Sequence, residues 1–163
     1  MSKIIPVDLI DFELLLGYTQ QKHSNKNEPI PKLSNNTERL ESCLNTPFQK
    51  FSGKHLYRGL LNKAAILFYL VNKNHPLING NKRMACICLD YFCFINGYSL
   101  DIPEDRFYEI AKAVVESDNS KKEEVIIIIK KITLEDAICV LQRFMSLIFK
   151  SNIKMEENGL NFS

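Results

Sequence analysis

Apolar residues recur along this chain at helical spacing, and no run of alternating apolar and polar residues of the kind that forms sheets is present. The pattern therefore predicts an all-α fold. The predicted helices cover these segments: Pro6 to Lys22, Asn36 or Thr37 to Leu44, Tyr57 to Lys73, Met84 to Ile95, a segment that begins at Pro103, Lys121 to Lys130, and a last one that begins at Thr133.

Two of these segments are the most apolar. Tyr57 to Lys73 has a broad apolar face, and Met84 to Ile95 is apolar almost all round, which predicts the buried central helix of a bundle. The β-branched run Val125 to Ile129 has strand propensity, but the lysines and glutamates around it stand at helical positions and favour a packed helix. The pattern predicts one domain over residues 1–150 and a polar, disordered tail over residues 151–163.

Composition narrows the class of protein. The chain has 163 residues, of which 45% are hydrophobic, and this is enough for one substantial core. With 21 basic and 19 acidic residues the formal net charge is +2, so there is no broad cationic surface for nucleic acid. The first residues do not form a signal peptide, and no apolar run reaches the length of roughly 20 residues needed to span a bilayer. We therefore expect a cytoplasmic protein without nucleic-acid or membrane partners.

The five cysteines allow two interpretations. Three of them, Cys86, Cys88 and Cys93, lie within one apolar segment, where they could form a metal cluster or act as small buried hydrophobes. Because no His or Asp at ligand spacing completes a metal set, the hydrophobic interpretation is favoured.

The stretch His75 to Arg83 concentrates the candidate chemistry. A neutral imidazole at His75 can accept a proton from a hydroxyl near pH 7. Gly80 allows a positive φ and a close approach to phosphate, while the donors and charges of Asn81, Lys82 and Arg83 can stabilise phosphate at a helix start. The stretch is not a Walker loop, because it lacks that motif's paired glycines and its Lys followed by Ser or Thr.

His75-Pro-x-x-x-Gly80-Asn81-Lys82-Arg83 resembles the signature of the Fic/Doc family, roughly His-x-Phe-x-(Asp or Glu)-(Gly or Ala)-Asn-(Gly or Lys)-Arg. The lysine variant looks like the Doc (death on curing) toxin branch, and the resemblance extends from about residue 36 to about residue 117. Two positions depart from the pattern. Leu77 replaces the aromatic residue, and Asn79 replaces the carboxylate that holds Mg²⁺ in the family, which makes it a weak metal ligand.

The resemblance implies a helical Fic/Doc fold that uses ATP and Mg²⁺ to modify a hydroxyl of a protein target. In the Doc branch the implied setting is a toxin paired with an antitoxin, and the implied target is a translation factor such as elongation factor Tu. Family members that transfer AMP have glycine after the motif Asn and a second Arg beyond the motif. Here Lys82 and Cys86 stand at those positions, which favours phosphoryl transfer over AMP transfer. A catalytically silent module that binds nucleotide or protein is the third alternative.

Two segments before the motif have a family interpretation beside a structural one. Thr37 and Glu41 partly match an inhibitory helix of some Fic proteins, but an ordinary packed helix is favoured. Thr46 to Leu56 has no helical period and corresponds by resemblance to a flap, a small β-hairpin beside the active site whose edge binds an extended peptide. The alternative is a connecting loop anchored by Phe48 and Phe51.

Overall fold

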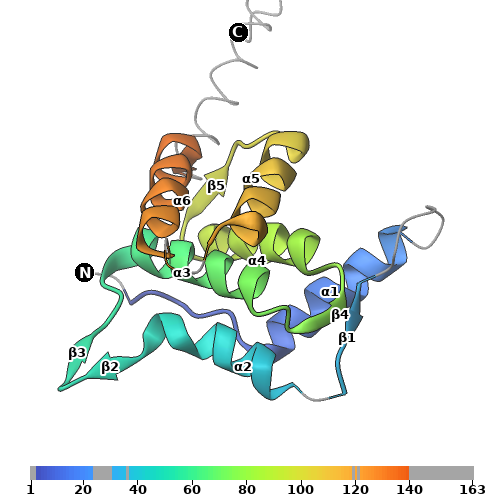
Figure 1. Cartoon of the computed structure of the whole chain (residues 1–163), viewed down its shortest axis with the longest axis horizontal. Helices are drawn as coiled ribbons and strands as arrows, with labels where there is room; N and C mark the ends of the chain where they lie inside the picture. Colours follow the sequence, from blue (N-terminus) through green and yellow to red (C-terminus); the bar gives the residue numbers. More distant parts are fainter. Residues whose placement is uncertain (1–2, 24–30, 36, 119, 121, 140–163) are drawn as a thin grey trace, which may run out of the picture.

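The computed structural model describes residues 3–23, 31–35, 37–118, 120 and 122–139 of the chain (Figure 1). Over these residues the fold is a helical bundle with short two-stranded sheets, which confirms the predicted all-α class. The elements in order are α1 (Leu9–His23), β1 (Lys32–Leu33), α2 (Glu38–Asn45), the 3₁₀ helix η1 (Thr46–Phe48), β2 (Lys50–Phe51), β3 (Lys54–His55), α3 (Gly59–Lys73), β4 (Leu77–Asn79), α4 (Asn81–Ile95), β5 (Tyr98–Leu100), α5 (Glu104–Glu116), α6 (Lys122–Asp136) and β6 (Ala137–Cys139).

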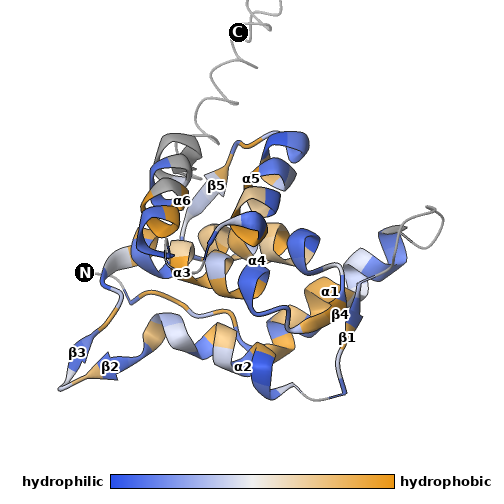
Figure 2. Ribbon diagram, viewed as in Figure 1, coloured by the Kyte–Doolittle hydropathy of each residue, from blue (hydrophilic) through white to orange (hydrophobic). Residues whose placement is uncertain are grey.

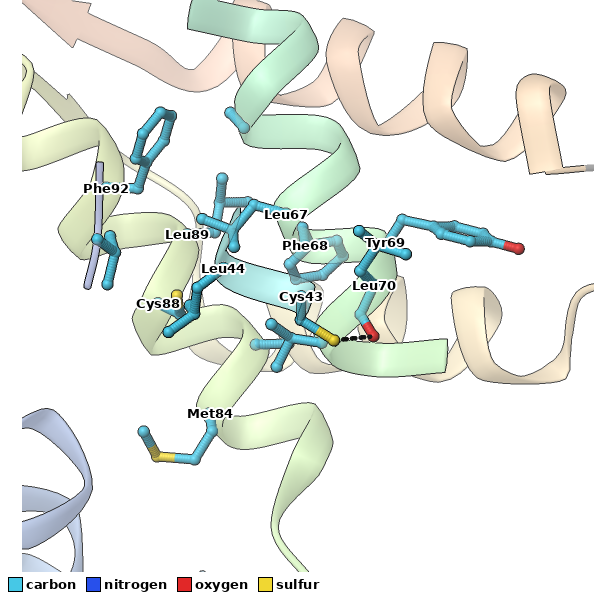
Figure 3. Close-up of a cluster of buried hydrophobic side chains, with 14 of the residues drawn as sticks. Cys43, Leu44, Leu67, Phe68, Tyr69, Leu70, Met84, Cys88, Leu89 and Phe92 are labelled. Carbon is cyan, nitrogen blue, oxygen red and sulfur yellow. Dashed lines mark hydrogen bonds between the residues drawn. The ribbon is translucent and has the colours of Figure 1, made fainter. Parts of the chain in front are cut away.

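Helices α3 and α4 form the centre of the bundle and pack against each other. Helix α3 also contacts α2, α5 and α6, and α4 also contacts α1 and α5. Figure 2 shows the apolar residues concentrated where these helices meet. Figure 3 shows the cluster itself, in which Leu67 and Phe68 of α3 pack with Leu89 and Phe92 of α4. Burial of these side chains is the main force that holds the bundle together.

Helix α3 is buried more completely than α4, the helix that the sequence pattern placed at the centre of the bundle. Every residue from Lys63 to Asn72 in α3 is buried, whereas α4 leaves Asp90 and Phe94 exposed. Phe94 is 60% exposed, although its segment is apolar almost all round. The reason is packing: helices surround α3 on more sides than α4.

The first helix begins later than predicted. Asp8 precedes it as an N-cap and accepts a hydrogen bond from the backbone N–H of Asp11 at 2.8 Å, while the Asp11 carboxylate accepts one from the N–H of Asp8 at 3.2 Å. This reciprocal pair satisfies N–H groups that the first turn leaves free, so the helix starts at Leu9 and not at Pro6. The residues of α1 that enter the core are Phe12, Leu16 and Thr19.

The last described helix is longer than predicted. Val125 to Ile129 is helical, as expected, but α6 continues through Thr133, where a new helix was predicted to begin. Thr133 is buried and its hydroxyl donates to the Ile129 carbonyl at 2.8 Å, so it acts inside the helix and not as a cap. After α6, β6 pairs antiparallel with β5. The remainder of the predicted last helix and the predicted tail lie outside the described residues.

The small β-hairpin exists, but its expected position beside His75 is wrong. β2 and β3 pair antiparallel around Ser52 and Gly53, whose φ values of 47° and 76° fit a tight hairpin turn. This hairpin precedes α3, whereas His75 follows the other end of that helix (Figure 1). The fifteen residues of α3 separate the two by about 22 Å at 1.5 Å per residue. The strand that reaches the motif is β1, which pairs antiparallel with β4.

Candidate active site

The motif forms a strand and a turn that lead into a helix. α3 ends at Lys73, Asn74 caps it, β4 carries the middle of the motif, and Gly80 stands immediately before the first residue of α4. This arrangement confirms that the motif leads into a helix start, although α4 begins at Asn81 and not at Met84 as predicted. The first N–H groups of a helix have no partners within it, so the start of α4 is an electropositive end next to the motif.

His75 combines an exposed side chain with an unusual backbone. Its φ is +44°, in the left-handed region that non-glycine residues adopt infrequently and histidine more readily than most. Such a conformation costs about 1–3 kcal/mol and persists only where surrounding structure enforces it. Because strained residues of this kind cluster at functional sites, the backbone supports a chemical role for His75 independently of the motif.

His75 lies at a cavity of about 620 Å³. One wall is formed by Asn74 to Ile78 of the motif loop, and the other by residues before and within α2: Ser34, Glu38, Arg39 and Ser42. The cavity brings an imidazole, a guanidinium and a carboxylate to one space, which is suited to a polar substrate. None of the residues from Gly80 to Arg83 lines it, so the predicted phosphate-binding residues lie outside this cavity.

Gly80 has the conformation that the sequence predicted. Its φ of 76° is left-handed, and a Cβ at this position would lie 2.7 Å from Cβ and Cγ of Pro31. Pro31 in turn is held by α1, because the Gln20 side-chain amide donates to its carbonyl at 2.8 Å. A glycine is therefore required here both for backbone conformation and for contact with the segment that leads to β1.

Asn81 braces the motif loop. Its side-chain oxygen accepts from the Leu77 N–H at 2.8 Å, and its side-chain nitrogen donates to the Leu77 carbonyl at 3.0 Å. The residue is 8% exposed, so these bonds are shielded from water. One N–H of the amide remains for a phosphate, and the phosphate contact stays a prediction. The sequence did not reveal the bracing role.

Lys82 and Arg83 are half-buried in the first turn of α4. The Lys82 ammonium nitrogen lies 5.6 Å from the centroid of the Tyr108 ring on α5, within range of a cation–π contact. This contact holds the cation beside the helix start. The predicted phosphate contacts of both residues stay predictions.

Asn79 has a side-chain oxygen that is buried and has no hydrogen-bond partner within the described structure. An unpartnered amide oxygen is a chemically reasonable Mg²⁺ ligand, but it is a single neutral one. The described residues contain no group of three or more His, Cys, Asp or Glu side chains that could hold a metal. The donor set therefore fits a metal ion whose remaining ligands are phosphate and water oxygens.

The cysteines of α4 belong to the core. Cys88 and Cys93 are buried, Cys86 is half-buried, and all three are free thiols. Burial raises the pKa of Cys86 and of Cys93 to about 12 and raises the pKa of Cys88 as well. These side chains are neutral small hydrophobes near pH 7, in agreement with the favoured interpretation of the sequence.

Comparison with known proteins agrees with this geometry. A model described as the Fic/DOC family matches residues 9–93, about half of the chain and including the whole motif. The chain belongs to the Fic/DOC family. It is 33% identical over 81 residues to the protein named Toxin Doc of Mycolicibacterium smegmatis, an overlap of 48% of this chain and 62% of that protein. The chain thus spans less than two thirds of that relative, and no solved structure matches.

Two residues that depart from the Fic/DOC pattern pack against other parts of the bundle. Leu77, at the aromatic position, is 4% exposed and joins the core, so the change is one of packing. Cys86, at the position of the second arginine, points its thiol to the Phe107 carbonyl at 3.6 Å. A neutral thiol engaged with α5 offers no charge to a nucleotide.

Sequence reasoning missed the contribution of α2 to this Fic/DOC site. Arg39 and Ser42 line the cavity, whereas Glu41, the candidate inhibitory residue, does not. The Glu41 carboxylate instead accepts a hydrogen bond from the Thr37 hydroxyl at 2.7 Å. The helical spacing of Glu38 and Ser42 was the only signal that could have placed these residues on one face.

Proposed function

We propose that this Fic/DOC protein transfers the γ-phosphoryl group of ATP to a hydroxyl of a protein target, with His75 as the general base. The observation that carries the proposal is the position of His75, exposed at a polar cavity and followed by a glycine turn into the start of α4. Phosphoryl transfer depends mainly on positioning and on stabilisation of charge. An imidazole within reach of the attacking hydroxyl can take up the proton that the hydroxyl releases.

The phosphates belong at the start of α4. Gly80 lets the backbone approach closely, and the N–H groups of the first turn, the remaining Asn81 N–H and the cations of Lys82 and Arg83 supply the donors. Mg²⁺, when bound, would neutralise phosphate charge, with Asn79 as its weak protein ligand. A half-buried Lys82 fills space that glycine would leave open, which supports the choice of γ-phosphoryl over AMP transfer.

The target segment belongs along β1 and β4. These strands form a two-stranded antiparallel sheet next to the motif, and Ile78 of β4 is 63% exposed at the cavity. An extended peptide can add to such an edge through main-chain hydrogen bonds. The similarity to a protein named Toxin Doc supports a toxin with a cognate antitoxin. We further propose that it acts in the cytoplasm on a translation factor such as elongation factor Tu, as the Doc-like motif implies.

Two parallel reactions test the proposal. The protein is incubated with Mg²⁺ and a cell lysate, once with ATP labelled on the γ-phosphate and once with ATP labelled on the α-phosphate, and His75→Ala is treated identically. We expect a labelled lysate protein only with the γ-label and only with the wild type. Label from the α-phosphate, or a mass increase equal to AMP on the target, would replace the kinase with an adenylyltransferase.

A silent binding module is the second candidate, and Asn79 is the observation that favours it. A neutral amide in place of the metal-binding carboxylate weakens the hold on Mg²⁺. The two candidates separate in one measurement: a silent module binds ATP in calorimetry but transfers neither label to any lysate protein.

A further inference from the structure

The residue immediately before His75 is held from two sides by one face of α2. Arg39 and Cys43 stand four positions apart on α2, and both contact Asn74. The Arg39 guanidinium lies 3.5 Å from the Asn74 carbonyl oxygen. The Asn74 side-chain amide lies 3.6 Å from the Cys43 sulfur, which itself lies 3.6 Å from the Leu70 carbonyl oxygen (Figure 3, dashed line).

These contacts form one chain of donors and acceptors at the end of α3. Asn74 donates to Cys43, and Cys43 donates to Leu70. The same Leu70 carbonyl accepts the backbone N–H of Asn74 at 2.9 Å. Carbonyl groups at a helix end lack partners within the helix, and Arg39 adds positive charge where the helix dipole is negative. The contacts thus fix where α3 stops and in which direction the chain leaves it.

The thiol is suited to this position only while it is protonated. Burial raises the pKa of Cys43, while the hydrogen bond from Asn74 and the charge of Arg39 lower it to a smaller extent. The side chain therefore keeps the S–H that it donates to Leu70. Cys43 is fully buried, whereas Arg39 is exposed, so the first is shielded from water and the second is open to the cavity.

From this arrangement we infer that Arg39 and Cys43 are positioning residues for His75, an inference that rests on the proposed function for its catalytic consequence. His75 leaves α3 with φ of +44°, a conformation that its own sequence does not favour. His75 lies between two residues that are held in place. Before it, Asn74 is held by α2, and after it, Leu77 is held by Asn81. The residues that hold Asn74 lie on α2, outside the motif.

The three histidines of the chain provide a direct test that needs no activity. The full-length protein is produced with labelled histidine, and the His75 signal is assigned by its loss in His75→Ala. We expect Arg39→Ala and Cys43→Ala to shift or broaden the backbone signal of His75 and to leave His23 and His55 in place. Cys43→Ser keeps a donor and an acceptor and should remain near the wild-type spectrum. Cys88→Ala removes an equally buried thiol that does not contact Asn74 and is the matched control.

Kinetics then separates positioning from substrate binding. With γ-labelled ATP varied and a fixed amount of lysate, Arg39→Ala and Cys43→Ala should lower kcat about tenfold and leave the KM for ATP unchanged, because a misplaced base affects the chemical step. Cys88→Ala should retain the wild-type kcat. A rise in KM alone for Arg39→Ala would overturn the inference, since Arg39 would then bind nucleotide.

The spectra decide the inference even if the proposed function fails. Because Arg39 is exposed, its truncation leaves no buried cavity, and we expect the variant to keep its fold. An unmoved His75 signal in folded Arg39→Ala and Cys43→Ala would overturn the inference, as would an equal shift in Cys88→Ala. If the wild type transfers no label at all, the proposed reaction is wrong and the His75 signal still reports whether α2 sets its conformation.

Discussion

The segments at the two ends of α3 are held in different ways. At the N-terminal end the β2–β3 hairpin extends from the bundle, and Phe51 on it is 73% exposed. At the C-terminal end, polar ties converge from several elements: Asn74 to α2, Asn81 to Leu77, and the Lys73 ammonium to the Val115 and Ser117 carbonyls of α5 and its cap. The side-chain hydrogen bonds to other elements thus gather around His75, whose backbone is strained. We interpret this difference between the two ends of α3 as that between a functional loop and a connecting loop.

The largest expected effect is the loss of transfer in His75→Ala. Removal of a general base lowers the rate by typically 10²–10⁴-fold. Because the side chain is exposed, the melting temperature should change little. Label transfer and a thermal melt measure the two quantities. His55→Ala, on the hairpin at the other end of α3, should retain full activity, and an equal loss there would erase the contrast between the ends.

The second effect compares two glycines with the same φ of 76°, Gly80 beyond the C-terminal end of α3 and Gly53 on the hairpin. An alanine at either position carries the left-handed strain of about 1–2 kcal/mol. Only at Gly80 does its Cβ also meet Pro31, at 2.7 Å, and such overpacking adds about 1–3 kcal/mol. Urea unfolding should show Gly80→Ala as the more destabilised variant. Equal losses of unfolding free energy would show that the Pro31 contact yields without cost.

The third expected effect is stronger Mg²⁺ binding in Asn79→Asp, at the C-terminal end of α3. Asn79→Asp adds a negative charge at the buried oxygen that has no partner, and a carboxylate binds Mg²⁺ more strongly than an amide. We expect the Mg²⁺ concentration for half-maximal transfer to fall several-fold. Ile78→Asp places the same charge on the neighbouring exposed side chain and should not tighten Mg²⁺ binding. If the two variants behave alike, Asn79 is not a metal ligand.

The smallest effect concerns Lys63, the buried lysine that secures the hairpin end. Its ammonium donates to the Pro47 carbonyl at 2.6 Å and lies 4.4 Å from the centroid of the Phe48 ring. Burial lowers the pKa of Lys63 from its ordinary 10.5. Between its folded and unfolded pKa values the unfolded chain binds more protons, so this group makes the free energy of unfolding rise with pH.

Lys63→Met should therefore lose this rise, and its free energy of unfolding should fall relative to the wild type as the pH approaches 10.5. Urea unfolding at pH 8 and at pH 10 measures the difference. Lys54→Met, on the exposed hairpin strand β3, is the control. A constant gap between Lys63→Met and wild type across this range would show that burial does not perturb the lysine.

Helical periodicity was sufficient to find the helices, and the residue types of the motif were sufficient to recognise it, because both depend on local sequence. It could not place contacts made over long separations. The strand β1 is two residues long and exists through pairing with β4, so Lys32 and Leu33 have no strand pattern of their own. Periodicity also did not show which apolar residues of α1 are buried, because Ile10, Leu14 and Tyr18 stand at helical spacing but are each at least 65% exposed.

The candidate site was predicted as a list of side chains, and the structure adds how they are held. The left-handed conformation of Gly80 followed from its residue type, and the structure confirms it. The bracing role of Asn81 could not be predicted from its residue type, because an amide next to two cations looks the same in sequence whether it binds phosphate or backbone. Arg39 and Cys43 had no signal near the motif, since they reach Asn74 only through the packing of α2 on α3.

The residues that line the cavity come from two parts of the chain that leave the ribosome at different times. The ribosome releases Ser34, Arg39 and the rest of the α2 wall well before His75, and β1 has no partner strand until β4 emerges. A nascent chain that ends before His75 therefore has one wall of the cavity and lacks the proposed base. The cavity is therefore complete only once β4 has emerged and paired with β1.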